Sequence, residues 1–235
     1  AVYIVLQEVL MGNLSLKSIL MMVPILLIAL PVHEFSHGWV AYKMGDPTAK
    51  YAGRLTLNPF KHLDLVGTIM MFIAGVGWAR PVPINPTNFK NRRTGTILVS
   101  LAGPLSNMVM GFISMFLWGV IVKLISVGVI PVESDQAVNI LTMAEEFFQT
   151  LIIVNISLSI FNLIPVPPLD GSRLISSFLP EESYYRFARY EQYIGLIFLA
   201  LVAFLPNNIF GGFISFFAIP VYRSMAVATQ FLLGL

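Results

Sequence analysis

Cysteine is absent from all 235 residues, and charged residues make up only 11% of the chain. Without cysteine the chain can form neither a disulfide bond nor a thiolate metal site. Soluble domains carry about 25% charged residues, so the scarcity of charge argues against a soluble globular class. We find no internal repeat, no low-complexity tract and no polar stretch long enough for a separate soluble domain. The net charge of +2 is too small to indicate nucleic-acid binding.

Hydrophobic residues are abundant, at 57% of the chain, and most of them fall in long runs. Five runs are near or above the roughly 20 residues that a helix needs to cross a bilayer: 18–42, 96–124, 143–165, 190–206 and 209–230. A sixth run, 65–79, is shorter and rich in glycine. These patterns predict an all-α polytopic membrane protein with about five to six transmembrane helices. We expect residues 1–235 to form a single membrane-embedded domain.

The basic residues indicate the path of the run 65–79. If this run enters the membrane and returns, twelve Lys and Arg residues share one side, and only Lys17 and Lys123 lie on the other. If the run crosses, the division becomes five against nine. Cytoplasmic loops carry an excess of Lys and Arg, so we predict five spans plus a re-entrant, partly β-like loop. The basic side then faces the cytosol.

A histidine pair lies within the run 18–42. His33 and His37 are four residues apart, so a helix places both on one face, one turn apart. Both imidazoles can then bind one metal ion, while Glu34 lies at the edge of that face, where it can take a proton from an attacking water. This is the H-E-x-x-H arrangement of zinc proteases. It predicts His33 and His37 as zinc ligands and Glu34 as the catalytic base.

A catalytic zinc needs a third protein ligand and an open position. Without cysteine, the candidates are carboxylates, and the best placed is Asp170, which follows the run 143–165 and three prolines that prevent a regular helix. We expect Gly171 to permit a tight turn after this ligand. Asp64, in the polar connection before the re-entrant run, is the alternative ligand. Together, His62 and Asp64 could tune or gate the site, but we favour a local hydrogen-bonded turn or helix cap for this pair.

Several motifs together resemble the site-two protease family of intramembrane metalloproteases, in its small bacterial or archaeal form without a PDZ domain. They are His33-Glu34-x-x-His37, Asn162…Pro165…Leu169-Asp170-Gly171, Arg54-Leu-Thr-Leu-Asn58-Pro59…His62, Gly75-Val76-Gly77 and Ser100-Leu-Ala-Gly103-Pro104-x-x-Asn107. The likeness covers roughly residues 18–185. Asn107 could reach the metal site, or Gly103-Pro104 at the start of a helix, with Asn107 one turn on, could serve helix packing.

The resemblance implies one zinc ion bound by His33, His37 and Asp170, with Glu34 as the base. It also implies that Asn162 contacts the substrate backbone, and that Gly75 and Gly77 belong to a re-entrant loop that lays an edge strand beside an unwound substrate. The expected substrates are single-pass membrane proteins in the lipid bilayer. The expected location is a prokaryotic cell membrane, with the active site toward the cytosolic face.

Two other functions fit the motif less well. A membrane-anchored protease that acts on cytosolic loops usually carries a sizeable soluble catalytic domain, and none is visible. A metal transporter or sensor with the same ligands should show paired repeats and polar residues in several spans, and the sequence shows neither. We therefore predict a protease that cleaves peptide bonds within or near transmembrane segments.

Overall fold

The structure is a computed structural model that describes residues 16–64, 66–67, 79–204 and 207–235. Long helices dominate these residues: α2 (Leu16–Met44), α5 (Arg92–Ser126), α6 (Asp135–Asn162), α8 (Glu181–Phe204) and α9 (Asn207–Leu233). Shorter elements connect them, namely α3 (Thr48–Tyr51), α7 (Asp170–Ser176) and the 3-10 turns η1 (Pro59–Lys61) and η2 (Pro86–Asn88). The described residues contain no strand, only an isolated antiparallel bridge between Leu63 and Ala79.

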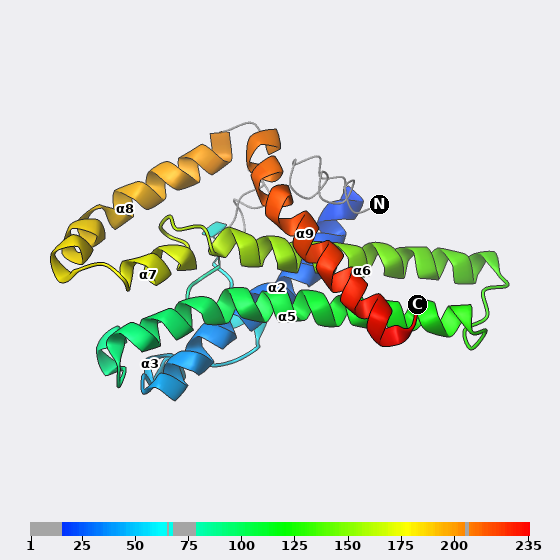
Figure 1. The fold of residues 1–235 in the computed structure, drawn as a ribbon, viewed down its shortest axis with the longest axis horizontal. Coiled ribbons are helices and arrows are strands. Elements are labelled where there is room, and N and C mark those ends of the chain that lie inside the picture. The colour runs from blue at the N-terminus through cyan, green and yellow to red at the C-terminus, as the bar shows by residue number, and fades with distance from the viewer. Residues whose placement is uncertain (1–15, 65, 68–78, 205–206) are drawn as a thin grey trace.

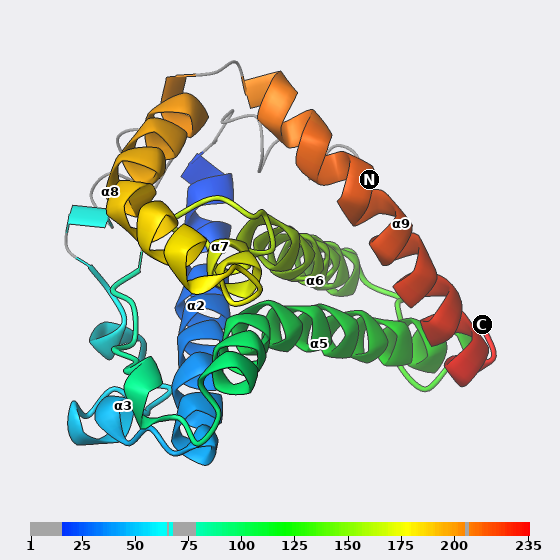
Figure 2. The same ribbon diagram turned by 60° about the vertical axis from the view of Figure 1, so that its left-hand side comes forward.

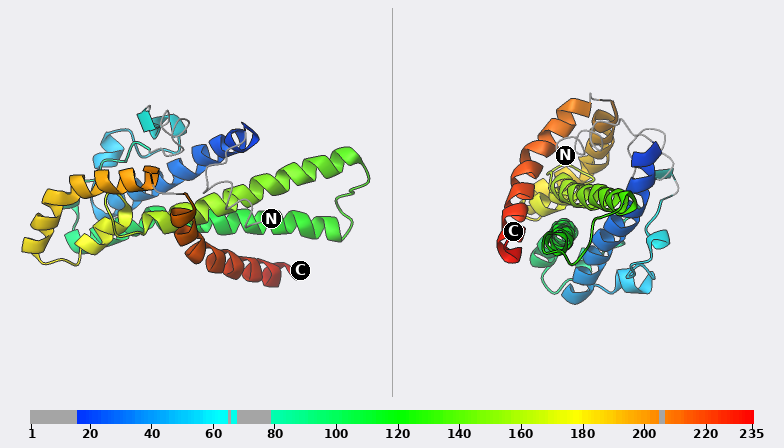
Figure 3. Two further views of the ribbon diagram at one scale, coloured as in Figure 1. Left: turned by 90° about the horizontal axis from the view of Figure 1, so that it is seen from above. Right: turned by 90° about the vertical axis from the view of Figure 1, so that its right-hand side faces the viewer.

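Helix α6 lies at the centre of the bundle. It runs antiparallel to α5, while α2 crosses the pair on one side and α9 lies across the other (Figures 1 to 3). Ile152 and Ile156 of α6 pack with Met115 of α5 and Ala218 of α9. On its other side, α6 packs against Ile25 of α2. The first half of the chain is thereby held against the helix that leads to the predicted third ligand.

Four helices in the described part of the chain are long and apolar enough to cross a membrane. They are Leu20–Met44, Arg92–Ser126, Asp135–Asn162 and Gly211–Leu233. Each overlaps a predicted span, and α8 corresponds to the predicted run 190–206 but is not among the four. The apolar helices define a multi-pass integral membrane protein.

Two helices differ in extent from the apolar runs that predicted spans. Helix α6 begins at Asp135, eight residues before the predicted run, because the Ser134 hydroxyl accepts a hydrogen bond from the Ala137 amide at 3.1 Å and caps the helix. It ends at Asn162 rather than residue 165. Helix α8 likewise begins at Glu181 rather than residue 190. Apolar runs report lipid-facing stretches, and these helices continue into more polar sequence that the runs do not include.

The connection between α2 and α5 starts and finishes at the same end of the bundle. The Lys90 amide donates to the Met44 carbonyl at 3.2 Å, which joins the last residue of α2 to the residues just before α5. Within the connection, the bridge between Leu63 and Ala79 brings together the flanks of the predicted re-entrant run. Most of that run, including Gly75 and Gly77, lies outside the described residues.

Candidate metal centre

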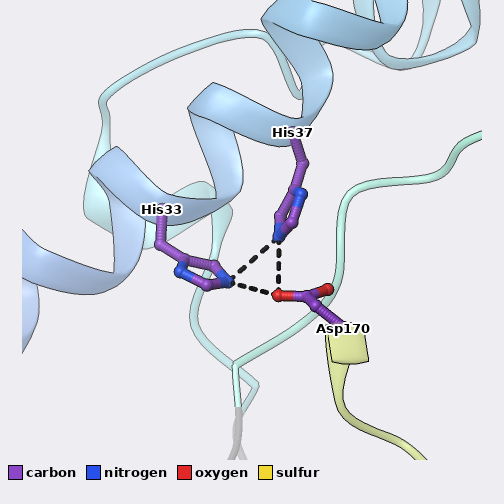
Figure 4. A group of neighbouring side chains, drawn as sticks. All are labelled: His33, His37 and Asp170. Carbon is purple, nitrogen blue, oxygen red and sulfur yellow. Dashed lines mark hydrogen bonds and ion pairs between the residues drawn. The ribbon is translucent and has the colours of Figure 1, made fainter. Parts of the chain in front are cut away.

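The two histidines lie side by side on the buried face of α2. Each is 6% exposed, and their Nε2 atoms are 3.0 Å apart (Figure 4). The spacing of four residues on one helix produces this arrangement, because it places the side chains one turn apart on the same face.

Asp170 completes the group from another part of the chain. It is the first residue of α7, and its Oδ2 atom lies 3.1 Å from each histidine Nε2 (Figure 4). The proline-containing segment between α6 and α7 carries it there. His33, His37 and Asp170 are the group in the described residues whose ligand atoms lie close enough together to hold a metal ion.

The other ring nitrogens show how the histidines are protonated. The His37 Nδ1 atom lies 2.7 Å from the Val99 carbonyl, which can only accept a hydrogen bond, so Nδ1 carries the proton and Nε2 keeps its lone pair. The His33 Nδ1 atom lies 2.6 Å from the Asn107 Oδ1 atom, an arrangement of the same kind. Two nitrogen lone pairs therefore converge on a carboxylate oxygen, an arrangement that a bound metal cation would satisfy.

The distances fit zinc. Zinc bonds of about 2.0–2.1 Å place tetrahedral ligand atoms about 3.3 Å apart, close to the 3.0 and 3.1 Å separations in this group. Two imidazoles and one carboxylate are also the protein ligands of several catalytic zinc sites, which keep a further position open.

Gly103 of α5 lies directly against the two imidazoles. A Cβ atom at this position would be 2.3 Å from the His37 Nε2 atom and 2.5 Å from the His33 Nε2 atom. Any side chain would thus occupy the space beside the ligand nitrogens. The sequence had indicated helix packing for this glycine, and the structure places it against the metal-ligating histidines.

Glu34 points to the same space, but it is not part of the ligand group. Its Oε2 atom accepts a hydrogen bond of 2.8 Å from the Val82 amide. Val82 lies between Pro81 and Pro83, and proline has no amide hydrogen, so Val82 supplies the single backbone donor of this tripeptide. The bond holds one carboxylate oxygen and leaves the other available for a proton.

A cavity of about 650 Å³ opens beside these residues. His33, Glu34, His37 and Asp170 line one part of it. Apolar side chains from α2, α6, α8 and the connection between α2 and α5 line most of the rest, among them Leu26, Leu30, Phe60, Leu158 and Phe161. The cavity can therefore receive an apolar chain next to the metal-ligating group.

Several other predicted residues have different surroundings. Asp64, the alternative ligand, is outside the metal-ligating group and accepts a hydrogen bond of 2.8 Å from the Gly67 amide. The His62 Nε2 atom lies 2.7 Å from the Thr56 carbonyl, six residues earlier in the chain. Asn162 lines the cavity, and its amide nitrogen donates to the Leu158 carbonyl at 2.9 Å.

The sequence predicted a tight turn at Gly171, and this prediction was wrong. The residue lies in the first turn of α7 rather than in a tight turn. Its importance is close approach, because a Cβ atom there would be 2.3 Å from the Leu163 carbonyl oxygen. The glycine lets the start of α7 press against the segment that leaves α6, which keeps Asp170 near the histidines.

Paired histidines with an adjacent glutamate, a distant aspartate and a bundle of membrane-length helices define the class of membrane-embedded zinc metalloproteases. The model of Peptidase family M50 matches residues 21–205, and the chain belongs to this family.

Two relatives carry names of the same kind. The chain is 44% identical over 176 residues to YwhC of Bacillus subtilis, named for an inferred zinc metalloprotease activity, and the match covers 75% of this chain and 77% of YwhC. It is 31% identical over 192 residues to the similarly named Rip2 of Mycobacterium tuberculosis, a match that covers 80% of this chain and 67% of Rip2. No solved structure gives a significant match. The predictions of a metalloprotease, of its family and of zinc are thereby confirmed.

Proposed function

We propose that this zinc metalloprotease cleaves peptide bonds within or near the transmembrane segments of single-pass membrane proteins. The observation that carries the proposal is the position of the metal-ligating group, inside the helix bundle and beside a cavity with mostly apolar walls. His33, His37 and Asp170 would hold the zinc ion, and Glu34 would act as the base.

The chemistry follows from these positions. Zinc, when bound, supplies a Lewis acid that polarises the scissile carbonyl. Glu34 takes a proton from the attacking water and later delivers it to the amine that leaves. The Val82 amide keeps the Glu34 carboxylate oriented during both transfers. His33 and His37 keep their Nε2 lone pairs free because their Nδ1 atoms hold the protons.

The substrate must present an unwound backbone, since the carbonyls of a helix are already hydrogen-bonded. The apolar wall of the cavity, formed by residues such as Leu26, Leu30 and Phe161, suits side chains of a transmembrane segment. Asn162 lines the same cavity and can contact the substrate backbone. We propose that the loop containing Gly75 and Gly77 adds an edge strand to the unwound segment by main-chain hydrogen bonds.

We also propose five spans with a re-entrant segment at 65–79, and an active site toward the cytosolic face. Two contacts support this topology. The bond between Lys90 and Met44 returns the chain to the end of the bundle at which α2 finishes. The bridge between Leu63 and Ala79 places the two flanks of the segment side by side. Twelve of the fourteen basic residues then share one side, as expected for the cytosol.

A cleavage assay with the full chain tests the function. The purified protein in bilayers is given a single-pass reporter protein and, separately, an unstructured soluble peptide. We expect cleavage of the reporter within or near its transmembrane segment, loss of cleavage after chelation and recovery with zinc. Glu34→Gln should abolish cleavage while the bound zinc is retained.

The outcomes separate the alternatives. Cleavage of the soluble peptide alone would favour a protease for cytosolic segments and overturn the intramembrane proposal. Zinc binding without cleavage of either substrate would favour a transporter or sensor. Wild-type activity in the Glu34→Gln variant would show that Glu34 is not the base.

A further inference from the structure

Two buried asparagines connect the metal centre to the middle of α6. Asn107 of α5 and Asn155 of α6 are 1% and 0% exposed. The Asn155 amide nitrogen donates to the Leu151 carbonyl at 2.9 Å, and the Asn107 amide nitrogen donates to the Asn155 Oδ1 atom at 2.9 Å. The Asn107 Oδ1 atom in turn lies 2.6 Å from the His33 Nδ1 atom. We call Asn107 and Asn155 the asparagine relay.

The Leu151 carbonyl fixes the orientation of both side-chain amides. A backbone carbonyl can only accept, so the side-chain nitrogen of Asn155 must face Leu151 and its oxygen must face Asn107. Asn107 must then turn its nitrogen toward Asn155 and its oxygen toward His33. His33 can satisfy that oxygen only with a proton on Nδ1, which leaves the lone pair on Nε2 for the metal.

Reversing either amide is costly at these positions. A flipped Asn155 would place its nitrogen against the Asn107 nitrogen and its oxygen against the Leu151 carbonyl. A buried polar group that loses its partner keeps the full cost of its removal from water. By contrast, an Asn107 without Asn155 could present either its oxygen or its nitrogen to His33. Asn155 therefore makes the orientation of Asn107 unique.

We infer that Asn155 and Asn107 are positioning residues that hold His33 in the tautomer that binds zinc. The inference rests on the proposed zinc site. His37 needs no such relay, because its Nδ1 atom bonds directly to the Val99 carbonyl. Partners of this kind typically change metal affinity by about 10- to 100-fold. Asn155 is two hydrogen bonds away from His33 and has no place in the metal-ligating group.

Zinc affinity of the full chain in detergent, measured by competition with a chelating dye, tests the relay. We expect Asn155→Leu to weaken zinc binding by about 10- to 100-fold. Asn155→Asp should restore most of the affinity, because a protonated carboxyl group donates to Leu151 and accepts from Asn107 as the amide does. Thr150→Val is the matched control: it removes a buried hydroxyl bonded to the Glu146 carbonyl on the same helix, and zinc binding should not change.

A purely structural role would give a different result. Asn155→Leu would then lower the Tm of the zinc-free protein and leave zinc affinity unchanged, which would overturn the inference. If wild-type protein binds no zinc, or if Asp170→Ala binds it as wild type does, the proposed metal site fails instead. If Asn155→Leu does not fold, Asn155→Ala decides: it removes the amide without adding bulk, so zinc affinity should fall by about 10- to 100-fold, and unchanged affinity would overturn the relay.

Discussion

At the scale of single residues, the metal centre leaves no room for a side chain at Gly103. It lies on α5, and the histidines that it touches lie on α2, so its lack of a side chain sets how closely the two helices approach. The space beside the two Nε2 atoms exists because nothing projects from this position.

Replacing Gly103 with alanine should therefore prevent zinc binding. The added methyl group would lie 2.3 to 2.5 Å from ring atoms of His37 and His33, well inside van der Waals contact. We expect zinc affinity to fall by at least 100-fold, the upper end of the effect of perturbing the groups around a metal site, as measured by chelator competition. Gly111→Ala on the same helix is the control, because its nearest neighbour would be 3.4 Å away. Equal zinc affinity in both variants would contradict the prediction.

Some residues of the metal centre could be predicted from the sequence, and others could not. His33, Glu34 and His37 share one helix, so their spacing alone indicated their arrangement, and the proline-rich segment pointed to Asp170. Asn155 gave no such signal, because its contact with Asn107 depends on the relative register of α5 and α6. The amide of Val82 is also invisible as a motif, since every residue other than proline has one.

Among the elements, the extended segment 79–85 has a clear structural role. Its contacts begin at the bridge between Ala79 and Leu63 and continue with the Arg80 carbonyl, which accepts from Arg54 at 2.6 Å. They end where the Asn85 amide donates to the Asp46 carboxylate at 2.7 Å. Between these anchors, the Val82 amide meets Glu34. The segment is therefore held at both ends while its middle orients Glu34, the proposed catalytic base.

Val82→Pro tests this role, because it removes the amide hydrogen in a segment that already contains two prolines. We expect kcat to fall by about 10- to 100-fold, as small misplacements of a catalytic group do, with zinc affinity unchanged. Val82→Ala keeps the amide and loses only side-chain packing, so it should retain most activity. Equal losses of kcat in the two variants would show that side-chain packing, not the amide, matters.

Asp46 anchors the same segment, and the stability that it contributes depends on pH. Burial raises the pKa of this carboxyl group, but hydrogen bonds from Thr48, Asn85 and Asn88 outweigh burial and hold the pKa below its ordinary value of 3.8. Because the folded pKa is lowered, the stabilisation by Asp46 is fully present above pH 3.8 and is lost as pH falls through the folded pKa.

Asp46→Asn should therefore destabilise the protein most at neutral pH. We expect a loss of about 2 kcal/mol there, the scale of hydrogen bonds to a charged group. The difference in Tm between wild type and variant should shrink as the pH is lowered below 3.8. A difference in Tm that stays constant or grows in acid would contradict this account.

The elements themselves were largely predictable. Apolar runs located the five long helices because lipid-facing and buried faces are both apolar. Their ends were less accurate, since α6 and α8 extend beyond the apolar runs. The close approach of α7 to the segment after α6 depends on backbone contacts at Gly171, which composition does not report.

For the whole molecule, the absence of cysteine makes the topology directly measurable. Single cysteines can be introduced at Tyr51 and Val129, which are 83% and 63% exposed and lie in connections on either side of α5. With an impermeant maleimide on intact cells, we expect labelling of Val129→Cys only. Permeabilised cells should show labelling of both variants. Labelling of Tyr51→Cys in intact cells would reverse the proposed orientation.

The asparagine relay also has a thermodynamic consequence. Helix α6 carries Asn155, and the chain that leaves its end reaches Asp170, so one rigid helix governs two of the three proposed ligands. Coupling between binding and conformation is reciprocal: zinc strengthens the docking of α6 on α2 and α5, and displacement of α6 weakens zinc binding by the same factor. If the inferred relay operates, loosening of this helix lowers zinc affinity, so that zinc binding and helix docking are coupled.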